Sequence, residues 1–279
     1  MKYILVFLLL FSCGAKKPKD ITNPIDDKVA VVRQWLPTCN GYVSKAACDD
    51  GDVMLWSGLL CLSGETIGCA TARASFDQDG RAWRSPRRVG ADTYPTFSRD
   101  QFLGALAYFV GSKDTETAQK YMAWVRKHNN RVCMDLCDMT PVTWGIAASV
   151  WHYLGLPLTS EMKSGQRLDE LGSVVSAIFN EGYKLHLIMV ADLLKQKTGT
   201  ENFAWKIIAA TVYEKQPYNP FATYLRFGRS DITKQRLINR IPTSQPAVMN
   251  QWSFERDESE QAWRSSMCWE FVFMGNLMR

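Results

Sequence analysis

Histidine is scarce in this sequence, and its scarcity removes several catalytic chemistries. The chain has only three, His128, His152 and His186, and none stands in the HExxH spacing that zinc peptidases use. No serine occupies a Gly-x-Ser-x-Gly turn, so a serine nucleophile of the α/β-hydrolase kind is not expected. The glycine-rich pattern of a nucleotide-binding loop is also missing. Zinc hydrolysis, serine hydrolysis and nucleotide binding are therefore disfavoured.

The sequence also lacks a concentration of charge of one sign. Its 33 Lys and Arg residues are interspersed with 28 Asp and Glu residues, which leaves a net charge of +5. A nucleic-acid-binding chain usually has a basic stripe or a known motif, and neither is found, so no nucleic-acid partner is predicted. A mildly basic surface would suit an anionic polymer or an acidic membrane surface.

The N-terminal apolar run Tyr3–Phe11 is too short to span a bilayer as a helix. It follows a charged start at Lys2 and is typical of an export signal. The residues that follow it, Leu10-Phe11-Ser12-Cys13-Gly14, resemble the bacterial lipobox, in which a small residue precedes a cysteine that becomes lipid-modified.

The lipobox resemblance implies a membrane anchor in a bacterial cell envelope. Residues 1–12 would be a signal peptide, Cys13 would carry the acyl chains, and residues 13–27 would form a flexible tether. Residues 28–279 would then be a single domain. The alternative is an ordinary cleaved signal peptide with a coincidental cysteine.

Cysteine numbers fit export into an oxidising compartment, where disulfides form. Besides Cys13 the chain has seven, and their spacing suggests three short disulfide loops that leave one buried free thiol. The expected pairs are Cys39 with Cys48, Cys61 with Cys69, and Cys133 with Cys137, and the free thiol is Cys268. Zinc at the last pair is the alternative, but no second Cys or His pair lies nearby with ligand spacing. No metal and no cofactor are predicted.

Helical patterns fill most of the chain, and no β-alternation is long enough to demand a sheet. The clearest helix start is Ser98-Arg99-Asp100-Gln101, which has the form of a capping box with Ser98 as the cap and Gln101 reaching back to it. With 46% hydrophobic residues the chain can bury a large core. The sequence predicts an all-α protein.

The expected helices are of two kinds. One kind is apolar nearly all round, which predicts burial; these helices start at Asp52, Ser98, Thr140, Glu181 and Ser259. The other kind carries a polar face and would cover the first; these helices start at Glu65, Asp114, Ser160 and Thr200. This alternation resembles the (α/α)-toroid class of carbohydrate-active proteins, over roughly residues 53–277. The resemblance implies a ring of helical hairpins, a central cleft lined by inner helices, and a glycan substrate.

In such a ring the cleft lies at the N-terminal ends of the inner helices, which makes the carboxylates there candidates for catalysis. Glycoside hydrolysis needs one protonated and one ionised carboxyl. Asp100 is expected to be the general acid, with Glu258 or Asp52 as its partner, on an acidic polysaccharide or peptidoglycan. The alternative is that each carboxylate only stabilises a helix N-terminus through the helix dipole.

Tryptophan and arginine occur together in two loops, which bears on the substrate. Trp83 and Arg84 lie in one loop, Trp252 and Arg256 in the other, and Arg99 stands beside Asp100. Aromatic rings stack on sugar faces and arginine pairs with carboxylates, so an acidic glycan is predicted. The alternative is that the tryptophans belong to the core and the arginines to a solvated rim.

Two further functions remain open. A polysaccharide lyase would use a base such as Tyr94 or His152. A non-catalytic envelope protein would bind a glycan or a protein partner through the Trp and Arg loops. An enzyme needs two carboxyls about 5 to 10 Å apart across a cleft, whereas a binding module needs only an aromatic platform.

Overall fold

The computed structural model describes residues 24–91, 97–132, 139–166, 168–255 and 260–279. These contain fourteen α-helices and one two-stranded antiparallel sheet, β1 (Thr38–Cys39) with β2 (Tyr42–Val43). The predicted all-α class is confirmed. No helix among the described residues is both long and apolar enough to cross a membrane.

The helices follow one another closely along the chain. In order they are α1 (Pro24–Val32), α2 (Val53–Leu62), α3 (Thr66–Ala74), α4 (Arg99–Ser112), α5 (Thr115–Lys127), α6 (Pro141–Tyr153), α7 (Ser160–Gly165), α8 (Asp169–Phe179), α9 (His186–Thr198), α10 (Phe203–Lys215), α11 (Pro220–Phe227), α12 (Asp231–Arg240), α13 (Glu260–Arg264) and α14 (Trp269–Leu277).

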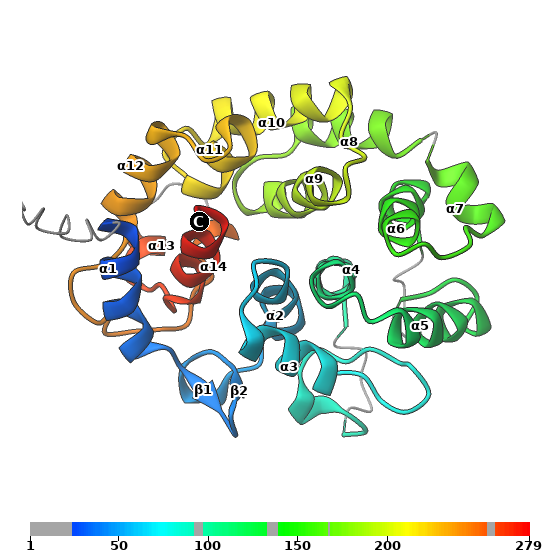
Figure 1. Cartoon of the computed structure of the whole chain (residues 1–279), viewed down its shortest axis with the longest axis horizontal. Coiled ribbons are helices and arrows are strands. Elements are labelled where there is room, and N and C mark those ends of the chain that lie inside the picture. The colour runs from blue at the N-terminus through cyan, green and yellow to red at the C-terminus, as the bar shows by residue number, and fades with distance from the viewer. Residues whose placement is uncertain (1–23, 92–96, 133–138, 167, 256–259) are drawn as a thin grey trace, which may run out of the picture.

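Some helices are enclosed and others cover them. Figure 1 shows α2, α4, α9 and α14 toward the middle, with α1, α3, α5, α7, α8, α10 and α12 around them. All residues of α2 from Val53 to Cys61 are buried, as are all residues of α4 from Gln101 to Val110. A helix that is apolar on all sides belongs in such a position. The predicted distinction between buried and covering helices is therefore seen in α2 and α4, and in the amphipathic α5 outside them.

Helices α2 and α4 pack backbone against backbone. A Cβ atom added to Gly58 would lie 1.8 Å from the carbonyl oxygen of Gly104, and one added to Gly104 would lie 2.4 Å from Cα of Leu55. Near the other end of α4, a Cβ atom on Gly111 would lie 2.6 Å from the Cys61 backbone. Residues later in α4 contact residues later in α2. The two helices therefore run parallel and begin at the same end of the molecule.

Two of the predicted disulfides are confirmed. Cys39 pairs with Cys48, which closes the loop that carries β1 and β2, and Cys61 pairs with Cys69, which joins α2 to α3. Cys268 is a buried free thiol, as expected. The predicted pair of Cys133 and Cys137 lies outside the described residues.

Several helix boundaries differ from the prediction. The chain is already helical at Pro24, within the segment expected to be a tether. The expected single helix from Ser259 to Leu277 is two helices, because Cys268 adopts a left-handed conformation with φ of 72° between α13 and α14. A Pro- and Asn-rich segment starts α11, with the Asn219 side chain accepting a hydrogen bond from the Phe221 amide.

Candidate functional site

The first candidate residue, Asp52, directly precedes α2. Its backbone is left-handed, with φ of 60° and ψ of 19°, a conformation that aspartate tolerates better than most side chains. Its carbonyl oxygen accepts the first helical hydrogen bond, from the Trp56 amide at 3.1 Å. The Asp52 side chain is 24% exposed, so its carboxyl group is only partly in contact with solvent.

A buried amide from α4 holds this carboxyl group. Gln101 has no exposed surface, and its Nε2 donates a hydrogen bond to Asp52 Oδ1 at 3.0 Å. The predicted capping box is therefore wrong. Ser98 makes no side-chain cap bond, and its hydroxyl donates to the Asp100 carboxylate instead. Gln101 faces the interior between two helices, where a carboxylate is the stronger acceptor.

Two basic side chains approach Asp52 from loops. Lys45 Nζ lies 3.7 Å from Asp52 Oδ2, and Arg84 Nη1 lies 3.7 Å from Asp52 Oδ1. The side chains of Lys45 and Arg84 are only 11% and 24% exposed. Partial burial of both cations strengthens their interaction with the carboxylate relative to that of surface pairs.

The pKa of Asp52 is raised in spite of these cations. Burial is the largest cause and favours the neutral acid, and the negative charge of Asp100 raises the pKa further, while Lys45, Arg84 and His186 lower it. Since His186 is the first residue of α9, the N-terminal ends of α2, α4 and α9 contribute charges to one site. A carboxyl group with a raised pKa that still contacts solvent is suited to proton donation.

The predicted acid, Asp100, lies in the first turn of α4. Its side chain is half-buried and accepts the hydrogen bond from Ser98. Arg99 beside it is exposed. The structure thus brings together three of the predicted residues, Asp52, Asp100 and Arg84.

The two predicted tryptophan platforms are enclosed instead. Trp83 is 6% exposed, its indole N–H donates to Asp77 Oδ2 at 3.0 Å, and the Arg81 guanidinium lies 3.8 Å from its ring centre. Trp252 has no exposed surface and stacks on Trp56 with 4.6 Å between ring centres. Neither ring offers a free face for a sugar, because both are almost completely buried.

Other candidate residues lie elsewhere. Glu258, Tyr94, Arg256 and Cys13 fall outside the described residues. His152 is exposed at the C-terminal end of α6, about 16 Å along that helix from its start at about 1.5 Å per residue. The N-terminal ends of α4 and α6 border one cavity through Arg99 and Thr140, so His152 is at the opposite end of α6 from that region.

Sequence reasoning missed Lys45, His186 and the true role of Gln101. Lys45 lies between the paired cysteines Cys39 and Cys48, and that short loop is the only sequence signal for its placement. Gln101 fits the pattern of a capping box as well as that of an inward-facing glutamine, and no local feature of the sequence distinguishes these two roles.

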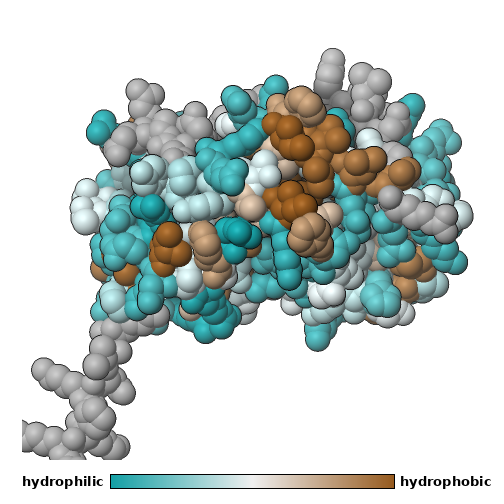
Figure 2. All heavy atoms as spheres, turned by 90° about the horizontal axis from the view of Figure 1, so that it is seen from above, coloured by the Kyte–Doolittle hydropathy of each residue, from teal (hydrophilic) through white to brown (hydrophobic). Residues whose placement is uncertain are grey.

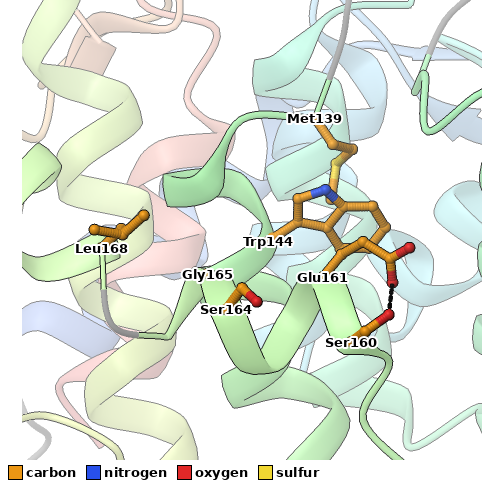
Figure 3. Close-up of a pocket in the computed structure, with 7 residues that line it drawn as sticks. All are labelled: Met139, Trp144, Ser160, Glu161, Ser164, Gly165 and Leu168. Atoms are coloured by element: carbon orange, nitrogen blue, oxygen red, sulfur yellow. Dashed lines mark hydrogen bonds between the residues drawn. The ribbon is translucent and has the colours of Figure 1, made fainter.

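A surface pocket of about 360 Å³ lies between α6 and α7. Figure 3 shows the Trp144 indole beside Met139 and Glu161, with the Ser160 hydroxyl donating to Glu161 at 3.1 Å. Trp144 is 5% exposed, so only a small part of its ring meets the pocket. Among the described residues, no group of three or more His, Cys, Asp or Glu side chains is placed to hold a metal ion.

Comparison with known proteins assigns neither a family nor a function to the chain. No protein-family model, no curated protein and no solved structure matches the chain.

Proposed function

We propose that this chain is a glycan-active protein of the bacterial cell envelope, and that it hydrolyses an acidic polysaccharide or peptidoglycan. The observation that carries the proposal is the Asp52 carboxyl group, which is partly exposed, has a raised pKa and interacts with the charge of a second carboxyl, Asp100. Glycoside hydrolysis needs this combination of a protonated acid and a second carboxyl.

Asp52, rather than Asp100, takes the role of general acid. Its Oδ1 already accepts the Gln101 hydrogen bond, so the proton resides on Oδ2 and passes from there to the glycosidic oxygen. Asp100 then stabilises the developing positive charge on the sugar or activates the attacking water. Lys45 and Arg84 give the site a basic rim that favours a sugar carrying carboxylate groups.

The ring of helical hairpins belongs to the same proposal. Contacts join α14 to α2, α2 to α4, α4 to α6, α6 to α9 and α9 to α11. Phe221 of α11 and Phe273 of α14 lie 5.4 Å apart, which would close the ring. The space enclosed by α2, α9 and α11 is only about 10 Å³. The substrate would therefore bind across the end of the ring, at the helix N-termini, rather than within it.

Attachment to the envelope rests on the lipobox-like residues around Cys13. A lipid anchor there would hold the domain at a membrane and within reach of an envelope polymer. Lipid attachment is tested by the mass of the N-terminal peptide from the mature protein, with Cys13→Ala as the control.

The hydrolase is tested by release of reducing ends from peptidoglycan and a panel of acidic polysaccharides. We expect release by the unaltered chain, and a loss of at least about 100-fold in Asp52→Asn, because general acid catalysis contributes about 10² to 10⁴ in rate. Asp100→Asn should also be impaired. Asp231→Asn, which removes an exposed carboxylate at the start of α12, is the matched control and should keep full activity. Full activity in Asp52→Asn would refute the assignment of the acid.

A non-catalytic glycan-binding protein is the second candidate. The observation that favours it is the surface pocket at Trp144 and Glu161, which combines an aromatic edge with a carboxylate and two serine hydroxyls. Binding of a glycan without any release of reducing ends, and its loss in Glu161→Gln, would support this candidate over the hydrolase. Unsaturated products in the same assay would instead reveal a lyase.

A further inference from the structure

A separate cavity of about 330 Å³ lies where α4, α6, α8 and α9 meet. Most of its wall is aliphatic, formed by Leu103 of α4, Val142 and Ile146 of α6, and Leu187, Ile188 and Ala191 of α9. Ligand pockets in proteins typically measure about 300 to 1,000 Å³ and are mostly apolar with a few placed polar groups. This cavity has both properties.

The hydroxyl groups around this cavity are largely satisfied within the protein. The Thr140 and Thr143 hydroxyls are hydrogen-bonded to each other at 2.7 Å, and the Ser176 hydroxyl accepts from Asn180 Nδ2 at 2.6 Å. A polar ligand such as a sugar would have to compete with these bonds. An apolar chain would not, because it needs only van der Waals contact and exclusion of water.

One cation stands at the edge of the cavity. Arg99 lines it, is exposed, and makes no ion pair with any residue that the structure describes. It is also the first residue of α4, whose N-terminal end carries a partial positive charge. An anionic group at the outer end of a bound chain would interact favourably with the Arg99 side chain and with the N-terminal end of α4.

The outer face of α8 next to the cavity is unusually apolar for a surface helix. Leu171, Val175, Ile178 and Phe179 lie on one face and are 66%, 46%, 51% and 80% exposed. Phe203 and Ile207 of α10 add 77% and 42% exposed side chains. Figure 2, which views the molecule from the side of α8 and α10, shows apolar side chains gathered on this face.

This apolar face of α8 adjoins the cavity. Gly172 and Ser176 line the cavity and follow Leu171 and Val175 directly in sequence, so on the helix they lie next to the exposed stripe. The glycine lets α8 approach α6 closely there: a Cβ atom on Gly172 would lie 2.4 Å from Cγ2 of Val142. The cavity and the exposed apolar stripe therefore share helix α8, which places apolar surface beside the cavity wall.

We infer that this cavity binds the acyl chain of an amphipathic anion, with Arg99 at the cavity edge as the partner of the anionic group. The inference is independent of the reaction proposed at Asp52. If each methylene takes about the space of one liquid water molecule, about 30 Å³, the cavity holds roughly ten of them.

The test is binding of straight-chain carboxylates of 6 to 16 carbons to the full chain, measured by calorimetry below their micelle concentrations. We expect affinity to rise about fourfold per added methylene and to stop rising near ten carbons. Continued increase to 16 carbons, or no binding at any length, would overturn the inference.

Variants separate the cavity from the outer surface. Ser176→Leu places a larger side chain at the cavity edge and should weaken decanoate binding at least tenfold. Thr211→Leu, which adds a leucine on α10 outside the cavity lining, should have no effect. Arg99→Gln should weaken decanoate but leave decanol unchanged. Equal loss for decanol and decanoate would contradict the role of Arg99, and unchanged binding in a folded Ser176→Leu would place the ligand on the surface.

Discussion

Asp52 and Asp192 show how the same type of side chain differs with its surroundings. Asp52 is held by Gln101 and approached by two cations, and its carboxyl group meets solvent. Asp192, on α9, is 1% exposed, and neither of its carboxylate oxygens has a hydrogen-bond partner among the described residues. Burial raises the pKa of Asp192 to about 8, with a further contribution from the charge of Glu201. Asp192 is thus a buried acid with no evident part in the proposed reaction.

The pKa of Asp192 gives a pH-dependent stability. Because its pKa rises from 3.8 in the unfolded chain to about 8 in the folded one, the folded state holds a proton that the unfolded state releases between these values. The stability from this group is therefore complete below pH 3.8 and is lost as the pH rises toward 8. We expect Asp192→Asn to be more stable than the unaltered chain at pH 9, by a few kcal/mol at about 1.4 kcal/mol per pKa unit.

Urea unfolding at pH 5 and pH 9 measures this difference. Asp231→Asn serves as the control, because Asp231 is exposed at the start of α12 and its loss should not alter the pH dependence. Equal pH dependence in Asp192→Asn and the unaltered chain would contradict the explanation.

At the residue scale, sequence reasoning could place a carboxylate at a helix start but could not identify its neighbours. Asp52 and Asp100 precede or open strongly apolar helices, and this local signal predicted both as candidates. Lys45 and Arg84 come from separate loops, so their approach to Asp52 depends on tertiary packing. The burial of Trp83 and Trp252 has the same origin, since composition cannot tell a packed ring from an exposed one.

At the scale of elements, the contact between α2 and α4 depends on the absence of side chains. Gly104 faces the backbone of Met54 and Leu55, where an added Cβ atom would lie 2.4 Å from Leu55 Cα and from the Met54 carbonyl oxygen. Such a contact cannot be relieved by rotating a side chain. The helices would have to separate, which would also move Gln101 away from Asp52.

We expect Gly104→Ala to destabilise the protein by about 3 kcal/mol or more, at the upper end of overpacking effects. Gly64→Ala is the comparison: Gly64 has φ of +92° and no atom within 4 Å of an added Cβ. Gly64→Ala should lower the free energy of unfolding only through backbone strain, by about 1 to 2 kcal/mol. Chemical unfolding of both variants gives the two values, and a smaller loss in Gly104→Ala than in Gly64→Ala would show that the helices adjust easily.

The presence of a helix was easier to predict from the sequence than its first and last residues. The apolar runs of α2 and α4 are long and uninterrupted, so burial and helical periodicity agree. The division between α13 and α14 falls at Cys268, which adopts a left-handed conformation although it is not a glycine, and its amide donates a hydrogen bond to the Ser266 hydroxyl at 3.0 Å. The error at Ser98 arose because a capping box and an inward-facing glutamine share one sequence pattern.

At the scale of the whole molecule, buried and covering helices could be predicted from which residues are apolar, and two disulfides from their short loops. The filling of the interior by side chains could not be predicted, because it depends on how Trp56, Phe221, Phe254 and their neighbours pack together. The location of the proposed site likewise follows from packing, which brings together the starts of α2, α4 and α9.

Cys268 reports on the integrity of the whole molecule. Its thiol has no exposed surface, and burial together with the charge of Glu270 raises its pKa to about 12. We expect iodoacetamide to leave Cys268 unmodified in the native protein and to modify it at the rate of global unfolding, as measured by peptide mass spectrometry. Fast modification in native conditions would indicate local opening around α14.

The central claim is that Asp52 is an acid whose proton is held by burial and by the charge of Asp100. The direct measurement is the pKa of the Asp52 carboxyl by carbon-detected NMR titration, in the unaltered chain and in Asp100→Asn. We expect a pKa above the ordinary 3.8 in the unaltered chain and a lower value once the Asp100 charge is removed. A pKa at or below 3.8, or one that Asp100→Asn leaves unchanged, would contradict it.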